Sequence, residues 1–199
     1  QIQKIDIIDI DQPFVAWTKN HEIVKKWRPY EDEITPRFIY QDARSWLTSN
    51  EELYDIIIFD LPGLKSDKLL PLYSIDFFEA VSQSLAHDGL FNMWIYTAEK
   101  NEYLYQKMYE MMYFVGMNQL KEYVSLNHAH KNELNETFLL ATKALNPPNF
   151  SPEKSDYTKL FQGFLSQYKW KRKPENFKAQ RSDFNSVFKP DFNMIVREK

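Results

Sequence analysis

Cysteine is absent from this 199-residue chain, and glycine occurs only four times. Without cysteine the chain can have no disulfide framework, no thiol nucleophile and no cysteine-based metal site. No apolar run approaches the roughly 18 residues needed to cross a bilayer, and the first residues are typical of a strand rather than a signal peptide. The net charge is only −3, so there is no electrostatic reason to expect nucleic acid or an anionic membrane as a partner.

What the chain does contain is a globular composition with alternating strand and helix patterns. Hydrophobic residues make up 43% of the chain, which suits a substantial core. Strands are predicted at 4–10, 37–40, 54–59, 90–96, 123–126 and 137–141, and helices from Pro13 onward, at 42–47, 75–85, 99–117 and 156–168. His87, Asp88 and Gly89 are expected to end the helix over 75–85. The alternation favours an α/β fold with a largely parallel sheet and helices on both faces.

Acidic residues follow three of the predicted strands. They are Asp9 with Asp11, Asp42, and Asp60. Ligands of such sheets bind at the carboxyl ends of the strands, where a carboxylate can accept the hydroxyls of a ribose or an adenine amino group. Aspartate is also favoured at helix N-caps and in turns. Position alone therefore leaves both interpretations open for each acid.

A series of longer motifs resembles one family. In order along residues 4–143 the chain contains IDIIDIDQPFV, PRFIYQDARSWL, YDIIIFDLP followed by LYSIDFF, GLFNMWIY and ETFLLATK. Together these segments resemble the spermidine synthase (polyamine aminopropyltransferase) family. The DLP wording and the tail motif DFNSVFKPDF are most similar to a bacterial branch of that family, which often has membrane segments upstream.

The resemblance implies a Rossmann-like, class I methyltransferase-type fold over residues 1–145, with residues 146–199 as a helical extension packed on it. By the family pattern, Asp9 with Asp11 would hold the ribose of an adenosyl donor, and Asp42 with Ala43 would contact adenine. Asp60 would orient an attacking amine and take its proton. The implied co-substrate is decarboxylated S-adenosylmethionine, or S-adenosylmethionine itself, with no tightly bound cofactor and no metal.

The chain also departs from the family pattern. The GGG-[DE]-G cofactor loop is absent, so we expect the first, central strand of the fold to lie outside this chain, on an upstream segment. Gly63 stands where the family has a second acid. The family usually has a glutamine near the position of Trp94, and this chain has none there. Asp67 is a candidate substitute for that acid, and Tyr73 is a further candidate substrate residue. The adenosine half of the site is therefore expected to be retained and the amine half altered.

Three functions remain open at this stage. The first is aminopropyl transfer to an amine by a cytoplasmic enzyme, with a homodimer and an upstream membrane anchor as further possibilities. The second is S-adenosylmethionine-dependent methyl transfer on the same fold, and the third is a catalytically inactive relative.

Three other features have simpler explanations than a functional site. His128 and His130 with Glu133 could be metal ligands, but no clear strand or helix fixes their geometry. The basic run KWKRK at 169–173 is typical of a solvated surface, with contact to phosphate or anionic lipid as the alternative. The Tyr/Met stripe over 103–117 is expected to be helix core with a wet rim, with a dimer face as the alternative.

Overall fold

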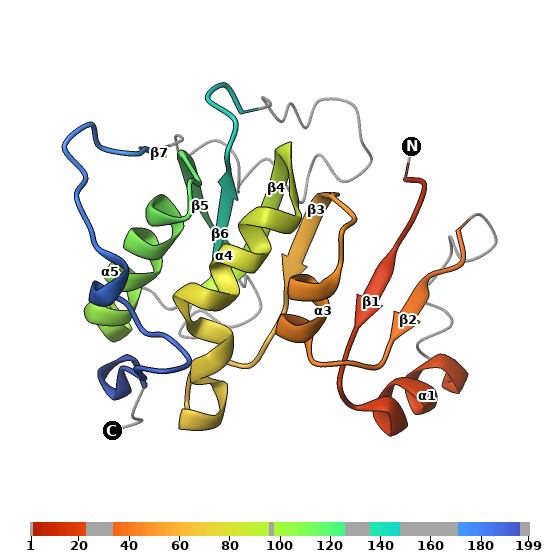
Figure 1. The fold of residues 1–199 in the computed structure, drawn as a ribbon. Coiled ribbons are helices and arrows are strands. Elements are labelled where there is room, and N and C mark those ends of the chain that lie inside the picture. The colour runs from red at the N-terminus through yellow and green to blue at the C-terminus, as the bar shows by residue number, and fades with distance from the viewer. Residues whose placement is uncertain (1, 23–33, 96–97, 126–135, 148–170, 196–199) are drawn as a thin grey trace. The chain divides into compact units, whose positions relative to one another are not determined.

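The computed structural model describes residues 2–22, 34–95, 98–125, 136–147 and 171–195 (Figure 1). The chain divides into two compact units, Gln1–Asn50 and Glu51–Lys199, called unit 1 and unit 2 below. The described strands form two separate hydrogen-bonded sheets, a pair in unit 1 and a five-stranded sheet in unit 2. Each unit is therefore described by itself.

In the described residues of unit 1, the elements are two parallel strands and two helices. The elements in chain order are β1 (Asp6–Ile8), α1 (Gln12–Asn20), β2 (Arg37–Ile39) and α3 (Ala43–Ser49). The strands pair in parallel with Asp6 opposite Arg37. The Arg37 guanidinium donates to both Asp6 carboxylate oxygens, at 2.9 and 2.6 Å, and the Asp6 side chain is 1% exposed. The Arg37 side chain is 45% exposed, so this forked pair joins a buried carboxylate to a half-exposed guanidinium and supports the register of β1 against β2.

Both helices of unit 1 begin at the predicted aspartates. Asp11 caps α1 by accepting a hydrogen bond from the Phe14 backbone N–H at 2.9 Å, with a proline in the first turn. Asp42 caps α3 by accepting one from the Ser45 N–H at 2.9 Å. Each carboxylate thus pairs one of the N–H groups that a helix start leaves without an intrahelical partner.

Unit 2 contains a mixed five-stranded sheet. Its strands are β3 (Tyr54–Phe59), β4 (Leu85–Ile95), β5 (Gln119–Ser125), β6 (Glu136–Thr142) and β7 (Lys171–Arg172), in the order β3-β4-β6-β5-β7. The pair β3–β4 is parallel and the remaining pairs are antiparallel. Among the described residues of this unit, the 3₁₀ helices are η1 (Asp67–Tyr73), η3 (Arg181–Asp183) and η4 (Phe192–Met194), and the α-helices are α4 (Ile75–Ser84) and α5 (Ala98–Phe114). The predicted α/β class is confirmed, and the sheet is mixed.

The prediction that His87, Asp88 and Gly89 end a helix is wrong. Helix α4 ends at Ser84, and the three residues belong to strand β4, which starts at Leu85. A Cβ atom on Gly89 would lie 2.9 Å from the Leu85 side chain and 3.0 Å from the Tyr54 carbonyl oxygen. Gly89 is therefore present because β3 and β4 approach closely there, and not because a helix needs a left-handed cap.

The core of unit 2 lies between its sheet and the two helices α4 and α5 (Figure 1). Phe59 at the end of β3 meets Phe77 and Phe78 of α4 at ring-centroid distances of 5.1 and 6.4 Å. The methionines of the predicted stripe are at most 1% exposed, while Tyr103 is 41% exposed. The stripe is therefore helix core with a wet rim, as predicted. The buried methionines are Met108, Met111, Met112 and Met117.

Several predictions fall outside the described residues. These are the histidine and glutamate group at 128–133, the helix over 156–168, and residues 169–170 of the basic run at 169–173. The next two residues of that run, Lys171 and Arg172, form strand β7. In the parts of the chain that are described, no helix is long and apolar enough to cross a membrane. No cluster of potential metal ligands is found among those same residues.

Candidate functional site

Asp9 lies directly after β1 and retains a connection to β2. Its backbone N–H donates to the Ile39 carbonyl at 3.1 Å, which extends the parallel ladder by one residue. One carboxylate oxygen, Oδ1, accepts the Asp11 backbone N–H at 2.7 Å. The other oxygen has no hydrogen bond to any described residue, and the side chain is half-buried. Asp9 is thus oriented through one oxygen, and its second oxygen is available to a ligand.

Asp42 follows β2 as Asp9 follows β1. Because β1 and β2 are parallel, the two acids come after the same end of the strand pair. Asp42 Oδ1 caps α3, and the Arg44 Nε lies 4.0 Å from the same oxygen. Ala43 is the first residue of α3. Unit 1 therefore places at the same end of its strand pair the acid predicted to hold ribose and the acid predicted to contact adenine. Any role of Asp42 in ligand binding would be in addition to its role as the N-cap of α3.

Asp60 differs from both of these acids. It follows β3 in unit 2, its side chain is exposed, and it has no hydrogen bond or ion pair with any described residue. Phe59, immediately before it, is 7% exposed and packs on α4. The end of β3 therefore presents a carboxylate that has no structural partner among the described residues.

The segment from Leu61 to Ser74, called the Asp60 loop below, is ordered by its own side chains. Tyr73 is 3% exposed, and its hydroxyl donates to the Pro62 carbonyl at 2.9 Å. Its ring also meets Phe59 at 5.7 Å between centroids. These contacts tie the end of the loop back to the residues just after Asp60.

Two further loop positions were singled out in the sequence, Asp67 and Gly63. Asp67 is exposed and accepts the Ser66 hydroxyl at 3.3 Å. Gly63 accepts the Lys65 N–H at 2.7 Å through its carbonyl. Among the described glycines only Gly116 has a positive φ, so the backbone at Gly63 suits a residue with a side chain. The structure thus groups Asp60, Asp67 and Tyr73 in one loop of unit 2, while Asp9, Asp11, Asp42 and Ala43 belong to unit 1.

Asn185 also holds the Asp60 loop, and this role could not be identified from the amino-acid sequence. Asn185 lies far along the chain, is 1% exposed, and donates to the Leu70 and Tyr73 carbonyls at 2.9 and 3.1 Å. Nothing in an isolated asparagine distinguishes a buried partner of a distant loop from a turn residue. The available signal was the tail motif DFNSVFKPDF, which contains Asn185 and which by itself indicated only a resemblance to one branch of the family.

The chain is similar to several known proteins. Residues 1–139 match the model of the spermine/spermidine synthase domain. The polyamine aminopropyltransferase 2 of Bacillus cereus is 30% identical over 90 residues, which are 44% of this chain and 24% of that protein. A spermidine synthase solved in complex with the transition state analogue AdoDATO is similar with a TM-score of 0.62 at 16% identity, over 77% of this chain and 51% of that one. Human methyltransferase-like protein 13 in complex with SAH has a TM-score of 0.50 at 15% identity, over 88% of this chain and 74% of that one.

The two structural likenesses define the class of fold, which is Rossmann-like and of the class I methyltransferase type. The domain match covers well over half of the chain, and the chain belongs to the spermine/spermidine synthase family. The chain spans about half the length of the spermidine synthase structure and a smaller share of the curated relative.

Proposed function

We propose that the protein transfers an aminopropyl group from decarboxylated S-adenosylmethionine to an amine. The amine nitrogen attacks the aminopropyl carbon next to the sulfonium, and the carbon–sulfur bond breaks with its electron pair moving to sulfur. Methylthioadenosine leaves as a neutral thioether, and the new ammonium loses one proton. The observation that carries the proposal is Asp60, an exposed carboxylate at a strand end with no partner among the described residues.

Asp60 would orient the amine and accept its proton. A general base must lie within hydrogen-bonding reach of the proton that it removes, and a carboxylate at the end of β3 with no partner among the described residues meets the chemical requirement. Asp67, on the same loop, is proposed as a second contact for the cationic substrate. Tyr73 is proposed to serve the substrate indirectly, because its hydroxyl is engaged by Pro62 and its ring is buried.

The adenosyl donor is proposed to bind at unit 1. The second Asp9 oxygen would accept the ribose hydroxyls while Asp11 holds the first oxygen. Asp42 and the adjoining Ala43 would contact the adenine. An ordinary diamine site would include a second acid at Gly63, so we propose an amine acceptor other than a simple diamine. The bacterial DLP-type branch, a homodimer, an upstream membrane anchor and a cytoplasmic location stay predictions.

The deciding experiment is calorimetric binding of methylthioadenosine to the longest natural form of the protein, with Asp9→Ala as the matched variant. Binding that Asp9→Ala weakens would support the adenosyl site. An amine screen with the decarboxylated donor would then identify the acceptor, and methyl transfer from S-adenosylmethionine in its place would assign the other donor. Absence of binding in the intact protein would overturn the proposed activity.

A further inference from the structure

The C-terminal residues 180–195 form a strap over helices α4 and α5 of unit 2 (Figure 1). The strap contains the 3₁₀ turns η3 and η4 and two buried apolar anchors, Phe184 at 3% and Met194 at 0% exposure. The Phe184 ring meets Phe114 of α5 at 5.2 Å. The strap is therefore packed into the unit and is not a loose end.

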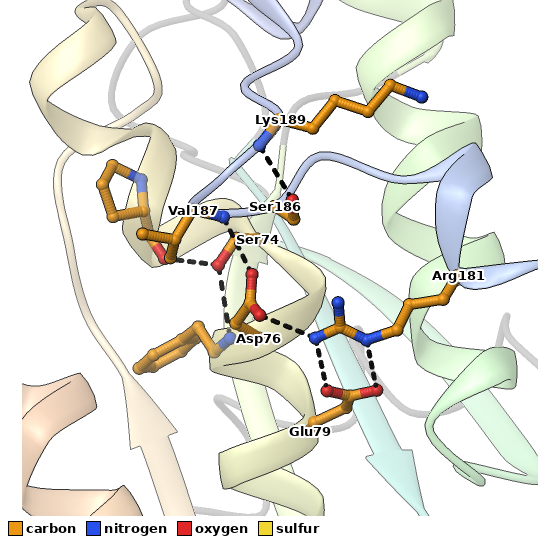
Figure 2. Close-up of polar contacts among 9 residues, drawn as sticks. Ser74, Asp76, Glu79, Arg181, Ser186, Val187 and Lys189 are labelled. Atoms are coloured by element: carbon orange, nitrogen blue, oxygen red, sulfur yellow. Dashed lines mark hydrogen bonds and ion pairs between the residues drawn. The ribbon is translucent and has the colours of Figure 1, made fainter.

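Polar contacts fix the strap on the first turns of α4 (Figure 2). The Arg181 guanidinium donates to Asp76 at 2.6 Å and to Glu79 at 3.2 and 2.9 Å. Asp76 also accepts the Val187 backbone N–H at 2.8 Å. Burial acts to raise the pKa of Asp76, but the bonds from Arg181 and Val187 outweigh it and hold that pKa below its ordinary value. The carboxylate is thus held charged at the junction of strap and helix.

Asn185 connects the strap to the Asp60 loop. Its amide nitrogen donates to the Leu70 and Tyr73 carbonyls, and its amide oxygen accepts the Asp191 N–H at 2.8 Å. Its backbone carbonyl accepts the Ile75 N–H at 2.8 Å. Both amide hydrogens and the amide oxygen are therefore engaged in a side chain that is 1% exposed.

The loop needs these donors where its 3₁₀ helix ends. The 3₁₀ helix η1 ends at Tyr73, and a helix end leaves its last carbonyls without N–H donors from the helix itself. The Ser74 hydroxyl donates to the Pro71 carbonyl at 2.7 Å, and Asn185 serves the carbonyls of Leu70 and Tyr73. Removing the Asn185 donors would leave two carbonyls at this buried junction without their partners.

We propose that Asn185 is a positioning residue for the reaction, acting on Asp60 through Tyr73. The path runs from the Asn185 amide to the Tyr73 carbonyl, then from the Tyr73 hydroxyl to Pro62, which lies two residues after Asp60. The strap thereby sets the loop that faces the amine, while the adenosyl contacts in unit 1 do not depend on it. This inference rests on the proposed function for its kinetic consequence and on the contacts above for its structural one.

The test is Asn185→Asp in the longest natural form of the protein, studied by hydrogen exchange and by kinetics. The introduced carboxylate keeps the acceptor for Asp191 but loses both donors and faces two carbonyls. Exchange in residues 61–74 should rise at least about tenfold, with strands β4 and β6 and all of unit 1 unchanged. The KM for the amine should rise about tenfold or more while the affinity for methylthioadenosine stays constant. Both effects should weaken as the pH falls, because protonation of the carboxyl restores one donor.

Tyr103→Phe is the matched control. It removes the 2.6 Å bond from the Tyr103 hydroxyl to Asp191, which tethers the strap to α5 and makes no contact with the loop. Exchange in residues 61–74 and the amine KM should be unchanged in this variant. If Asn185→Asp does not fold, Arg181→Ala provides the second test, with a smaller rise in loop exchange expected.

Unchanged loop exchange in the folded variant would overturn the positioning role. A uniform rise across β4, β6 and the loop would overturn it as well, since Asn185 would then stabilise the unit as a whole. If the unaltered protein transfers no aminopropyl group but the loop exchange rises as expected, the proposed function fails and the hold of the strap on the loop stands.

Discussion

The candidate site acids of the two units differ in their hydrogen bonding. In unit 1, Asp42 caps a helix, and one carboxylate oxygen of Asp9 accepts the Asp11 N–H. In unit 2, Asp60 has no partner among the described residues. A carboxylate with a structural bond is held in place whether or not a ligand is present. Asp60 follows the end of β3, where ligands of such sheets bind, and its carboxylate forms no bond with any described residue, so Asp60 carries the stronger argument for function.

The same contrast holds for the segments around the acids. Asp9 and Asp42 are oriented by neighbours within three residues in sequence. The loop after Asp60 is held by Asn185, which is more than a hundred residues away. The acids of the proposed adenosyl half are thus oriented by local hydrogen bonds of their side chains, whereas the loop of the proposed amine half is held in part by long-range contacts. Variants that separate the two halves test this comparison.

The largest effect is expected for Asp60→Asn. If Asp60 removes the amine proton, kcat should fall by about 100-fold or more, in keeping with the usual contribution of a general base. The melting temperature and the affinity for methylthioadenosine should not change, because the side chain has no described partner to lose. Steady-state kinetics and calorimetry check this.

Asp55→Asn is the control for that variant. Asp55 is an exposed acid of β3 itself, and its loss should leave the rate unchanged. An Asp60→Asn protein with full activity would contradict the role of Asp60 as the base that removes the amine proton.

The next largest effect separates capping from binding in unit 1. Asp42→Ser keeps a good helix N-cap, so stability should stay within a few tenths of a kcal/mol, whereas Asp42→Ala should cost about 1 kcal/mol. Both variants lose the carboxylate proposed to contact adenine, and both should weaken methylthioadenosine binding by roughly tenfold or more. Calorimetry and urea unfolding measure the two quantities. Wild-type affinity in Asp42→Ser would make Asp42 a cap alone.

A third variant addresses the altered amine half. Gly63→Asp restores an acid at the family position, and the backbone there requires no positive φ. We expect the KM for a simple diamine to fall about tenfold, because a carboxylate near an ammonium forms a charge-assisted bond. Gly63→Asn is the uncharged control and should leave KM unchanged. An equal effect of both substitutions would attribute any gain to shape and not to charge.

Much of unit 1 and of the sheet could be predicted from the sequence, because the signals are local. Asp11 and Asp42 lie one residue before their helices, and the run YDIIIF is short, mostly apolar and rich in isoleucine, which is typical of a strand. The prediction that His87 to Gly89 end a helix was wrong because Gly89 is required by the close approach of Tyr54, which is distant in sequence. The role of Asn185 stayed hidden for the same reason. Contacts between remote segments leave no periodicity to read.

The smallest expected effect concerns the outer tether of the strap at alkaline pH. The hydrogen bond to Asp191, together with burial, raises the pKa of Tyr103 to about 12, against about 10 for an unfolded tyrosine. Between those values the unfolded chain loses the proton first, so stability falls as the pH rises from about 10 to about 12. Tyr103→Phe should therefore show a shallower loss in urea unfolding between pH 9 and pH 11.5. Burial also raises the pKa of Tyr109 and lowers that of Lys143, but both groups are present in both proteins, so their contributions cancel in the difference. Identical pH slopes would mean that the strap is held on α5 by Phe184 and Met194 alone, with the hydroxyl contributing nothing.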